Sequence, residues 1–167
     1  PELLAYQDRT DGTAHVVRFP ATGEPRDTAL GHGLLLSLST PDGDARWAQA
    51  TEDSLFLPTA DVTQQLRYPT EQARPLHWDH APTLQRSHQA LWLLGLRDGQ
   101  MQVFHSPLQN LGVWSPPLLV GLPQSTLAAQ FAPSDTPDEL AIFALQRAAT
   151  GLVPQVWKLR AAPLAPT

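Results

Sequence analysis

The sequence contains no cysteine and only one methionine, Met101, among its 167 residues. The lack of cysteine excludes a disulfide framework, a thiolate nucleophile and a thiolate metal site. A chain so poor in sulfur also offers little to oxidation, which suits an oxidising environment. The chain starts at Pro1 and leads almost at once into a predicted strand, so we expect a leader or anchor to have been removed. The predicted location is extracytoplasmic, periplasmic or at the cell surface.

Charge is also scarce, because only 16% of the residues are charged and the net charge is −5. The basic residues are spread singly along the chain, whereas phosphate binding needs clustered lysine and arginine. We therefore expect no nucleic-acid partner. No stretch approaches the ~18 to 20 consecutive apolar residues of a membrane span, so we expect no transmembrane segment.

Proline, in contrast, is abundant, with 17 residues. It disfavours long helices and central strands, and so favours short strands joined by turns. Asp-Gly dipeptides at 11–12, 42–43 and 98–99 lie between runs of alternating apolar residues, which is typical of β-hairpin tips. The sequence predicts an all-β fold, an antiparallel hairpin-rich sandwich or barrel of about 10 to 12 short strands, in one domain over 1–159 with a tail or linker stub at 160–167.

A small β-propeller is the alternative architecture. It would need a fixed blade period, but the Asp-Gly turns are separated by 31 and then 56 residues. A sandwich or barrel is therefore the favoured arrangement.

Turn chemistry predicts the pairing of two hairpins. A two-residue turn at Asp98-Gly99 places Trp92 opposite His105 and Leu94 opposite Val103. A two-residue turn at Asp11-Gly12 would place Leu4 opposite Phe19 and Tyr6 opposite Val17 on the core face, with Asp8 opposite His15. The segment 21–33, which holds four glycine or proline residues, is predicted to be a loop.

Two signals compete over residues 137–150. Thr136, Pro137 and Glu139 form a helix start, and Gly151 lies where a helix would stop, so we expect one helix there. Against it, Leu140, Ile142 and Ala144 alternate as in a strand, and 153–159 could pair back on them.

Catalytic signatures are missing: there is no G-x-S-x-G elbow, no H-E-x-x-H and no Walker loop. The sequence therefore supports no enzyme class and favours a non-catalytic protein, although a catalytic site assembled from distant residues would leave no local pattern.

Histidines form the one cluster that predicts chemistry. His77, His80 and His88 lie within twelve residues, and His105 follows on a predicted strand. Neutral imidazoles are ligands that copper and zinc accept, so these residues are a candidate metal site with redox chemistry of the superoxide dismutase kind as one use. The His-x-His pair usual in that enzyme family is absent. The competing interpretation is a solvated loop with incidental histidines and no cofactor.

Two tryptophans, Trp78 and Trp114, lie in proline-rich segments and are, with Asp79, the candidate contacts to a ligand or partner. Exposed tryptophan rings also suit a glycan, so a carbohydrate-binding module is a further hypothesis. The leading hypothesis is a non-catalytic, exported or surface-associated β-domain that serves as a binding or structural module, with a protein partner in a larger assembly.

Overall fold

The computed structural model describes residues 2–39, 45–51, 53–58, 63–71, 74–75, 77–132 and 139–160. Strands account for 66% of the structure, and the described part of the chain holds no α-helix. The prediction of an all-β, antiparallel, hairpin-rich fold is therefore confirmed. The turn at Asp42-Gly43 and the tail after Arg160 lie outside the described residues.

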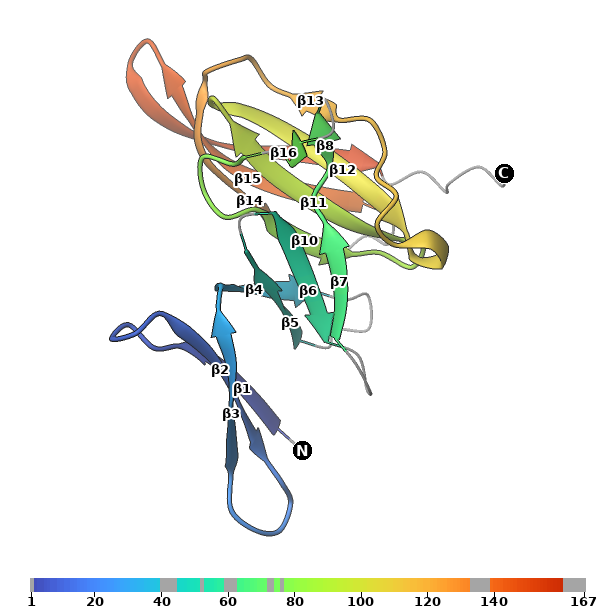
Figure 1. Cartoon of the computed structure of the whole chain (residues 1–167). Coiled ribbons are helices and arrows are strands. Elements are labelled where there is room, and N and C mark those ends of the chain that lie inside the picture. Colours follow the sequence, from blue (N-terminus) through green and yellow to red (C-terminus); the bar gives the residue numbers. More distant parts are fainter. Residues whose placement is uncertain are drawn as a thin grey trace.

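Sixteen strands are present in the described residues. They form a three-stranded N-terminal sheet, a curled eight-stranded sheet, a three-stranded C-terminal sheet and a two-stranded ribbon (Figure 1). Their bounds are β1 Glu2–Gln7, β2 Thr13–Phe19, β3 Arg26–His32, β4 Leu34–Ser39, β5 Ala45–Ala50, β6 Ser54–Pro58, β7 Thr63–Arg67, β8 Thr70–Glu71, β9 Arg74–Pro75, β10 Thr83–Arg86, β11 Ala90–Arg97, β12 Gln100–Pro107, β13 Leu118–Val120, β14 Thr126–Ala132, β15 Glu139–Ala148 and β16 Gly151–Arg160, with a short 3₁₀ helix at Leu108–Asn110.

The eight-stranded sheet consists of two up-and-down meanders, β4–β7 and β10–β13. Their first strands, β4 and β10, run parallel and pair through Leu38 and Leu84. Adjacent blades of a propeller are separate sheets, whereas here the two meanders share one hydrogen-bonded sheet. The sheet curls into half a barrel, which supports the sandwich or barrel architecture.

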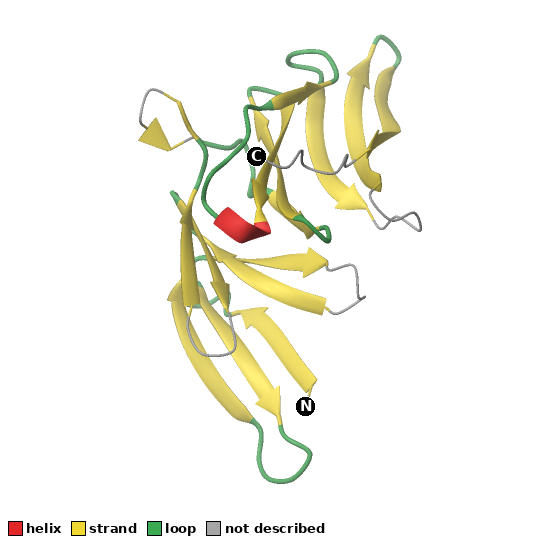
Figure 2. Cartoon of the chain, turned by 90° about the vertical axis from the view of Figure 1, so that its right-hand side faces the viewer, coloured by secondary structure: helices red, strands yellow, loops and turns green. Residues whose placement is uncertain are grey.

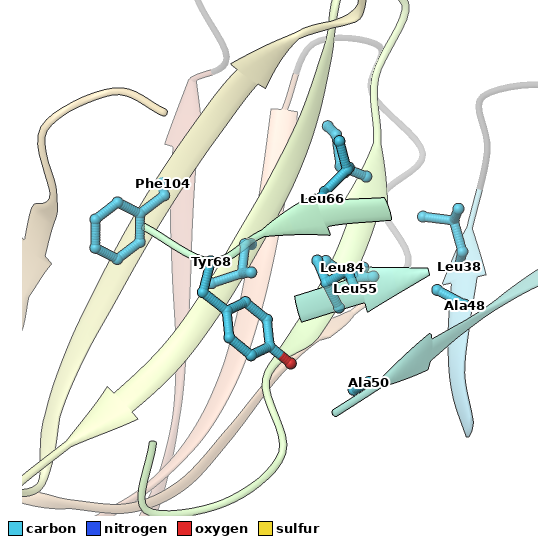
Figure 3. Packing of buried hydrophobic residues seen from close by; sticks show 10 residues of the cluster. Leu38, Ala48, Ala50, Leu55, Leu66, Tyr68, Leu84 and Phe104 are labelled. Atoms are coloured by element: carbon cyan, nitrogen blue, oxygen red, sulfur yellow. The ribbon is translucent and has the colours of Figure 1, made fainter. Parts of the chain in front are cut away.

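Strand β11 is covered on both faces, and each face belongs to a different core. Leu91 and Leu93 belong to one cluster of buried side chains, together with Leu55, Leu84 and Phe104. Figure 3 shows this first core. Trp92 and Leu94 point the other way, into a cluster shared with the C-terminal sheet. The near-continuous apolar run of β11 follows from this double burial, because both sides of a central strand must be apolar.

The hairpin at Asp98-Gly99 is confirmed with the predicted register. Trp92 pairs with His105 and Leu94 with Val103. Asp98 and Gly99 have φ values of 51° and 71°, the left-handed conformation that a tight two-residue hairpin turn requires at both positions.

The register predicted for Asp11-Gly12 is wrong by two residues. Leu4 pairs with Val17 and Tyr6 with His15. The turn is longer than predicted, since the Gly12 N–H donates to the Asp8 carbonyl at 2.8 Å. The face carrying Leu4 and Tyr6 is also not a core face, because these side chains are 52% and 36% exposed.

The helix expected over 137–150 and the loop expected over 21–33 are both replaced by strands. Strand β15 occupies 139–148 and pairs along its whole length with β16. It buries Leu140, Ile142 and Ala144. Burial of one alternating face thus outweighs the local helix-start signal. The predicted loop at 21–33 contains β3, which extends the N-terminal sheet by pairing with β2.

Candidate functional site

Trp78 and Asp79 act together as a clamp on the β11–β12 hairpin. The Trp78 ring lies so close to Gly95 of β11 that a Cβ at this glycine would overlap it. The same ring meets Tyr68 and Phe104 edge-on, each with a centroid distance of 6.0 Å. Gly95 is therefore the space into which the indole fits, and one face of Trp78 is not open to a stacking ligand.

The Asp79 carboxylate holds the turn of that hairpin. Its two oxygens accept hydrogen bonds from the backbone N–H groups of Asp98 at 3.0 Å and Gly99 at 2.9 Å. The Asp79 N–H also donates to the Leu96 carbonyl at 2.8 Å. Two turn donors that would otherwise face water are thus satisfied by one carboxylate.

Trp114 is tied to the fold as well. Its Nε1 donates to the Arg67 carbonyl at 2.8 Å, which joins the segment before β13 to the end of β7. The ring is partly buried and packs against the core that contains Leu91 and Leu93. Ligand contact by Trp78, Asp79 or Trp114 stays a prediction, but each has a structural role.

The four predicted metal ligands do not converge. His77, His80 and His88 are exposed, and His105 lies half-buried on β12 against Trp92, with ring centroids 4.8 Å apart. Burial lowers the pKa of His105. Among the residues that the structure describes, no group of three or more histidine, aspartate or glutamate side chains is placed to hold a metal ion.

Strand register explains this separation. Asp79, between His77 and His80, lies beside Leu96 at one end of β11, whereas His88 lies in the turn before Ala90 at the other end. The intervening six or so residues span about 20 Å in an extended strand. The four histidines therefore do not form one set of metal ligands.

His77 and His80 do share one hollow. Its volume is ≈ 270 Å³, and Trp78, Tyr68 and Pro82 also line it. The Tyr68 hydroxyl and the Trp78 Nε1 are buried without a hydrogen-bond partner in the structure. Burial and the nearby Asp53 charge raise the pKa of Tyr68, so this hydroxyl stays protonated.

The N-terminal sheet holds a polar network that the sequence did not predict. His15 Nδ1 lies 2.9 Å from Asp27 Oδ1, and the Tyr6 hydroxyl donates to Asp27 Oδ2 at 2.7 Å. The Tyr6 and His15 rings stack at 4.9 Å. The partner of His15 is therefore Asp27 on β3, not Asp8. Sequence reasoning does not find this partner, because it predicts a loop over 21–33, where β3 lies.

A hydroxyl lies at the other end of the His15 ring, with Thr13 Oγ1 2.9 Å from His15 Nε2. The order hydroxyl, imidazole, carboxylate is that of nucleophilic catalysts. Here, however, the Thr13 hydroxyl donates its one proton to Asp11 Oδ1 at 2.6 Å, away from the imidazole. The network therefore links β2 to β3 through the His15 imidazole.

In the described part of the chain, the N-terminal and C-terminal sheets each have a face that carries several exposed apolar side chains. The outer face of β14–β16 carries Phe143, Leu152 and Val156, which are 43%, 54% and 61% exposed; we name it the C-terminal face. The N-terminal face consists of Leu4, Tyr6, Val17 and Phe19 on β1 and β2. Three of these four side chains are more than a third exposed.

Comparison with protein-family models, with curated proteins and with solved structures finds no match to this chain. Among the described residues, no helix has the length and apolar character to cross a membrane.

Proposed function

We propose that this protein is a non-catalytic binding or structural module of a larger protein assembly, and that it docks through its C-terminal face. The observation that carries this proposal is the difference between the two sides of β15. Leu140 and Ile142 point inward and are buried, at 2% and 0% exposed, whereas Phe143 on the other side is 43% exposed. Contiguous exposed apolar side chains mark interaction sites on folded proteins.

Strand pairing makes this face contiguous. On the outer side, Phe143 lies opposite Val156, Leu145 opposite Pro154, and Arg147 opposite Leu152. Directly opposed residues in an antiparallel pair are close neighbours, with Cβ atoms ~4.5 to 5.5 Å apart. The apolar side chains therefore form one surface across two strands.

The partner is expected to be another β-sheet, packed face to face. Edge-to-edge pairing at β16 is disfavoured, because this edge strand carries Pro154, which lacks an N–H to donate. The inner side of the same sheet already packs on β11 and β12 through a sheet-to-sheet core. The C-terminal face presents the same kind of surface on its other side.

An exported or surface-associated location belongs to the proposal and is supported by the sulfur-poor composition. Copper, zinc and glycan binding gain no support from the placement of the histidines and tryptophans.

The test uses 8-anilinonaphthalene-1-sulfonate, a dye that fluoresces on apolar surfaces, with the folded chain at submicromolar concentration. We expect dye fluorescence in the wild type and a clear loss of it in Val156→Asp. The matched control is Leu122→Asp, because Leu122 is 74% exposed and lies on neither face. Absence of dye fluorescence, or equal loss in both variants, would contradict the proposal.

A further inference from the structure

We infer that the partner of the C-terminal face is a second copy of this chain, bound head to tail against its N-terminal face. This inference rests on the proposed function, since it names the partner for the same surface. It makes the two open faces of the molecule complementary halves of one interface.

The two faces cannot meet within one chain. The N-terminal sheet lies at one end of the molecule and the C-terminal sheet at the other, with the eight-stranded sheet between them (Figures 1 and 2). Each face is apolar and open, with Leu4 52% and Val156 61% exposed. Any contact between the two kinds of face therefore joins different copies.

Charge favours the head-to-tail arrangement over contact between two identical faces. The outer side of β15–β16 carries Arg147, Lys158 and Arg160 against the single acidic residue Glu139, an excess of two positive charges. Lys158 lies 3.8 Å from Glu139. Two C-terminal faces would therefore repel each other.

The N-terminal face is acidic. Asp27 lies on the face that carries Tyr6 and His15, and Asp11 lies at the end of the same polar network. Hydrogen bonds from Tyr6 and His15 hold the pKa of Asp27 below its ordinary value, so its charge persists at neutral pH. Opposite charges thus flank apolar centres on the two faces.

Size argues for a closed pair of copies. Three strands spaced by ~4.8 Å and about six residues long give a flat area of roughly 300 Å² for one contact. That is well below the ~800 Å² per partner of a standard interface. A half-barrel with one face at each end can close with a second half through two such contacts, which doubles the area per copy.

The experiment is sedimentation velocity on the full chain at concentrations up to about 100 µM, above the micromolar Kd typical of an interface this small. We compare the wild type with Val156→Asp on the C-terminal face, Leu4→Asp on the N-terminal face and Leu122→Asp as the control. All three positions are more than half exposed, so the fold is expected to survive, and circular dichroism checks this.

We expect the wild type and Leu122→Asp to form a pair of copies, and Val156→Asp and Leu4→Asp each to weaken association at least about tenfold, because each buries an unpaired carboxylate. An equimolar mixture of Val156→Asp and Leu4→Asp retains one intact contact and should form mixed pairs, detected by a tag on one variant.

Other outcomes overturn the inference. Association that Val156→Asp abolishes and Leu4→Asp leaves intact means contact between two C-terminal faces. A monomer at all concentrations removes the second copy as partner; if that monomer still binds the dye through Val156, the proposed docking function stands, and if it does not, both fail.

Discussion

The β11–β12 and β15–β16 hairpins are both long, regular and rich in apolar residues, but they differ in how they are covered. Strand β11 is buried from Ala90 to Leu96 and lies between two cores. Strand β16 has buried neighbours on one side only, and most of its side chains are exposed. The first hairpin therefore stabilises the fold, whereas the second leaves an apolar face for a partner. Four predictions sharpen this difference.

The same substitution should have unequal effects in the two hairpins. Leu93 is 0% exposed and Leu152 is 54% exposed. We expect Leu93→Ala to lower the free energy of unfolding by about 3 kcal/mol, because it leaves a cavity in the core, and Leu152→Ala to lower it by less than about 0.5 kcal/mol. Urea unfolding measures both. Similar losses would mean that the C-terminal face is covered in the single chain.

Gly95 should be intolerant of any side chain. The Cβ of an alanine at this position would overlap the Trp78 ring, so we expect Gly95→Ala to cost about 2 kcal/mol of stability. In a Trp78→Ala background the same change should cost much less. A thermal-unfolding double-mutant cycle with no coupling between the two sites would show that the indole does not occupy this space.

Removing the Asp79 carboxylate should loosen the Asp98-Gly99 turn. We expect Asp79→Ala to cost about 1 kcal/mol, because two charge-assisted hydrogen bonds at an exposed turn are lost. Asp79→Asn keeps one acceptor oxygen and should cost less. Hydrogen exchange at the Gly99 amide reports the effect directly, and unchanged protection in Asp79→Ala would refute the clamp.

The smallest effect concerns pH. The pKa of Asp27 is lowered first by the Tyr6 hydroxyl and then by His15, so its contribution to stability is present at neutral pH and is lost only as pH falls through this lowered pKa. We expect NMR titration of the Asp27 carboxyl to show a midpoint below the ordinary aspartate value, and Tyr6→Phe to raise it. An identical midpoint in both proteins would remove the hydroxyl as the cause.

Local turn chemistry shows why one hairpin register was predictable and another was not. At Asp98-Gly99 the two residues adopt the φ values of a two-residue turn, and the Asp79 carboxylate accepts hydrogen bonds from both of their N–H groups without changing the register. At Asp11-Gly12 neighbouring side chains lengthen the turn: Asp8 Oδ1 accepts from the Thr10 N–H at 2.8 Å, and Asp11 Oδ1 accepts from the Thr13 N–H at 2.9 Å. These side-chain hydrogen bonds to the backbone compete with the two-residue turn, and the Asp-Gly dipeptide alone gives no sign of them.

Alternation in the sequence shows which residues share a face, but not which face is covered. The alternation predicts that Leu4 and Tyr6 share one face, as observed, but both side chains on that face are exposed. The predicted histidine cluster fails for a different reason. His77 and His88 are close in sequence, but they lie near opposite ends of the eight-residue strand β11. Sequence spacing carries no information about such separation.

Head-to-tail pairing of two copies is tested most directly by the mass of the wild-type chain in solution, measured by sedimentation equilibrium across a range of concentrations. We expect a concentration-dependent rise from the 18.3 kDa of one chain toward twice that mass. We also expect high salt to weaken the association, because opposite charges flank the two faces. A single 18.3 kDa species at every concentration and salt level would contradict it.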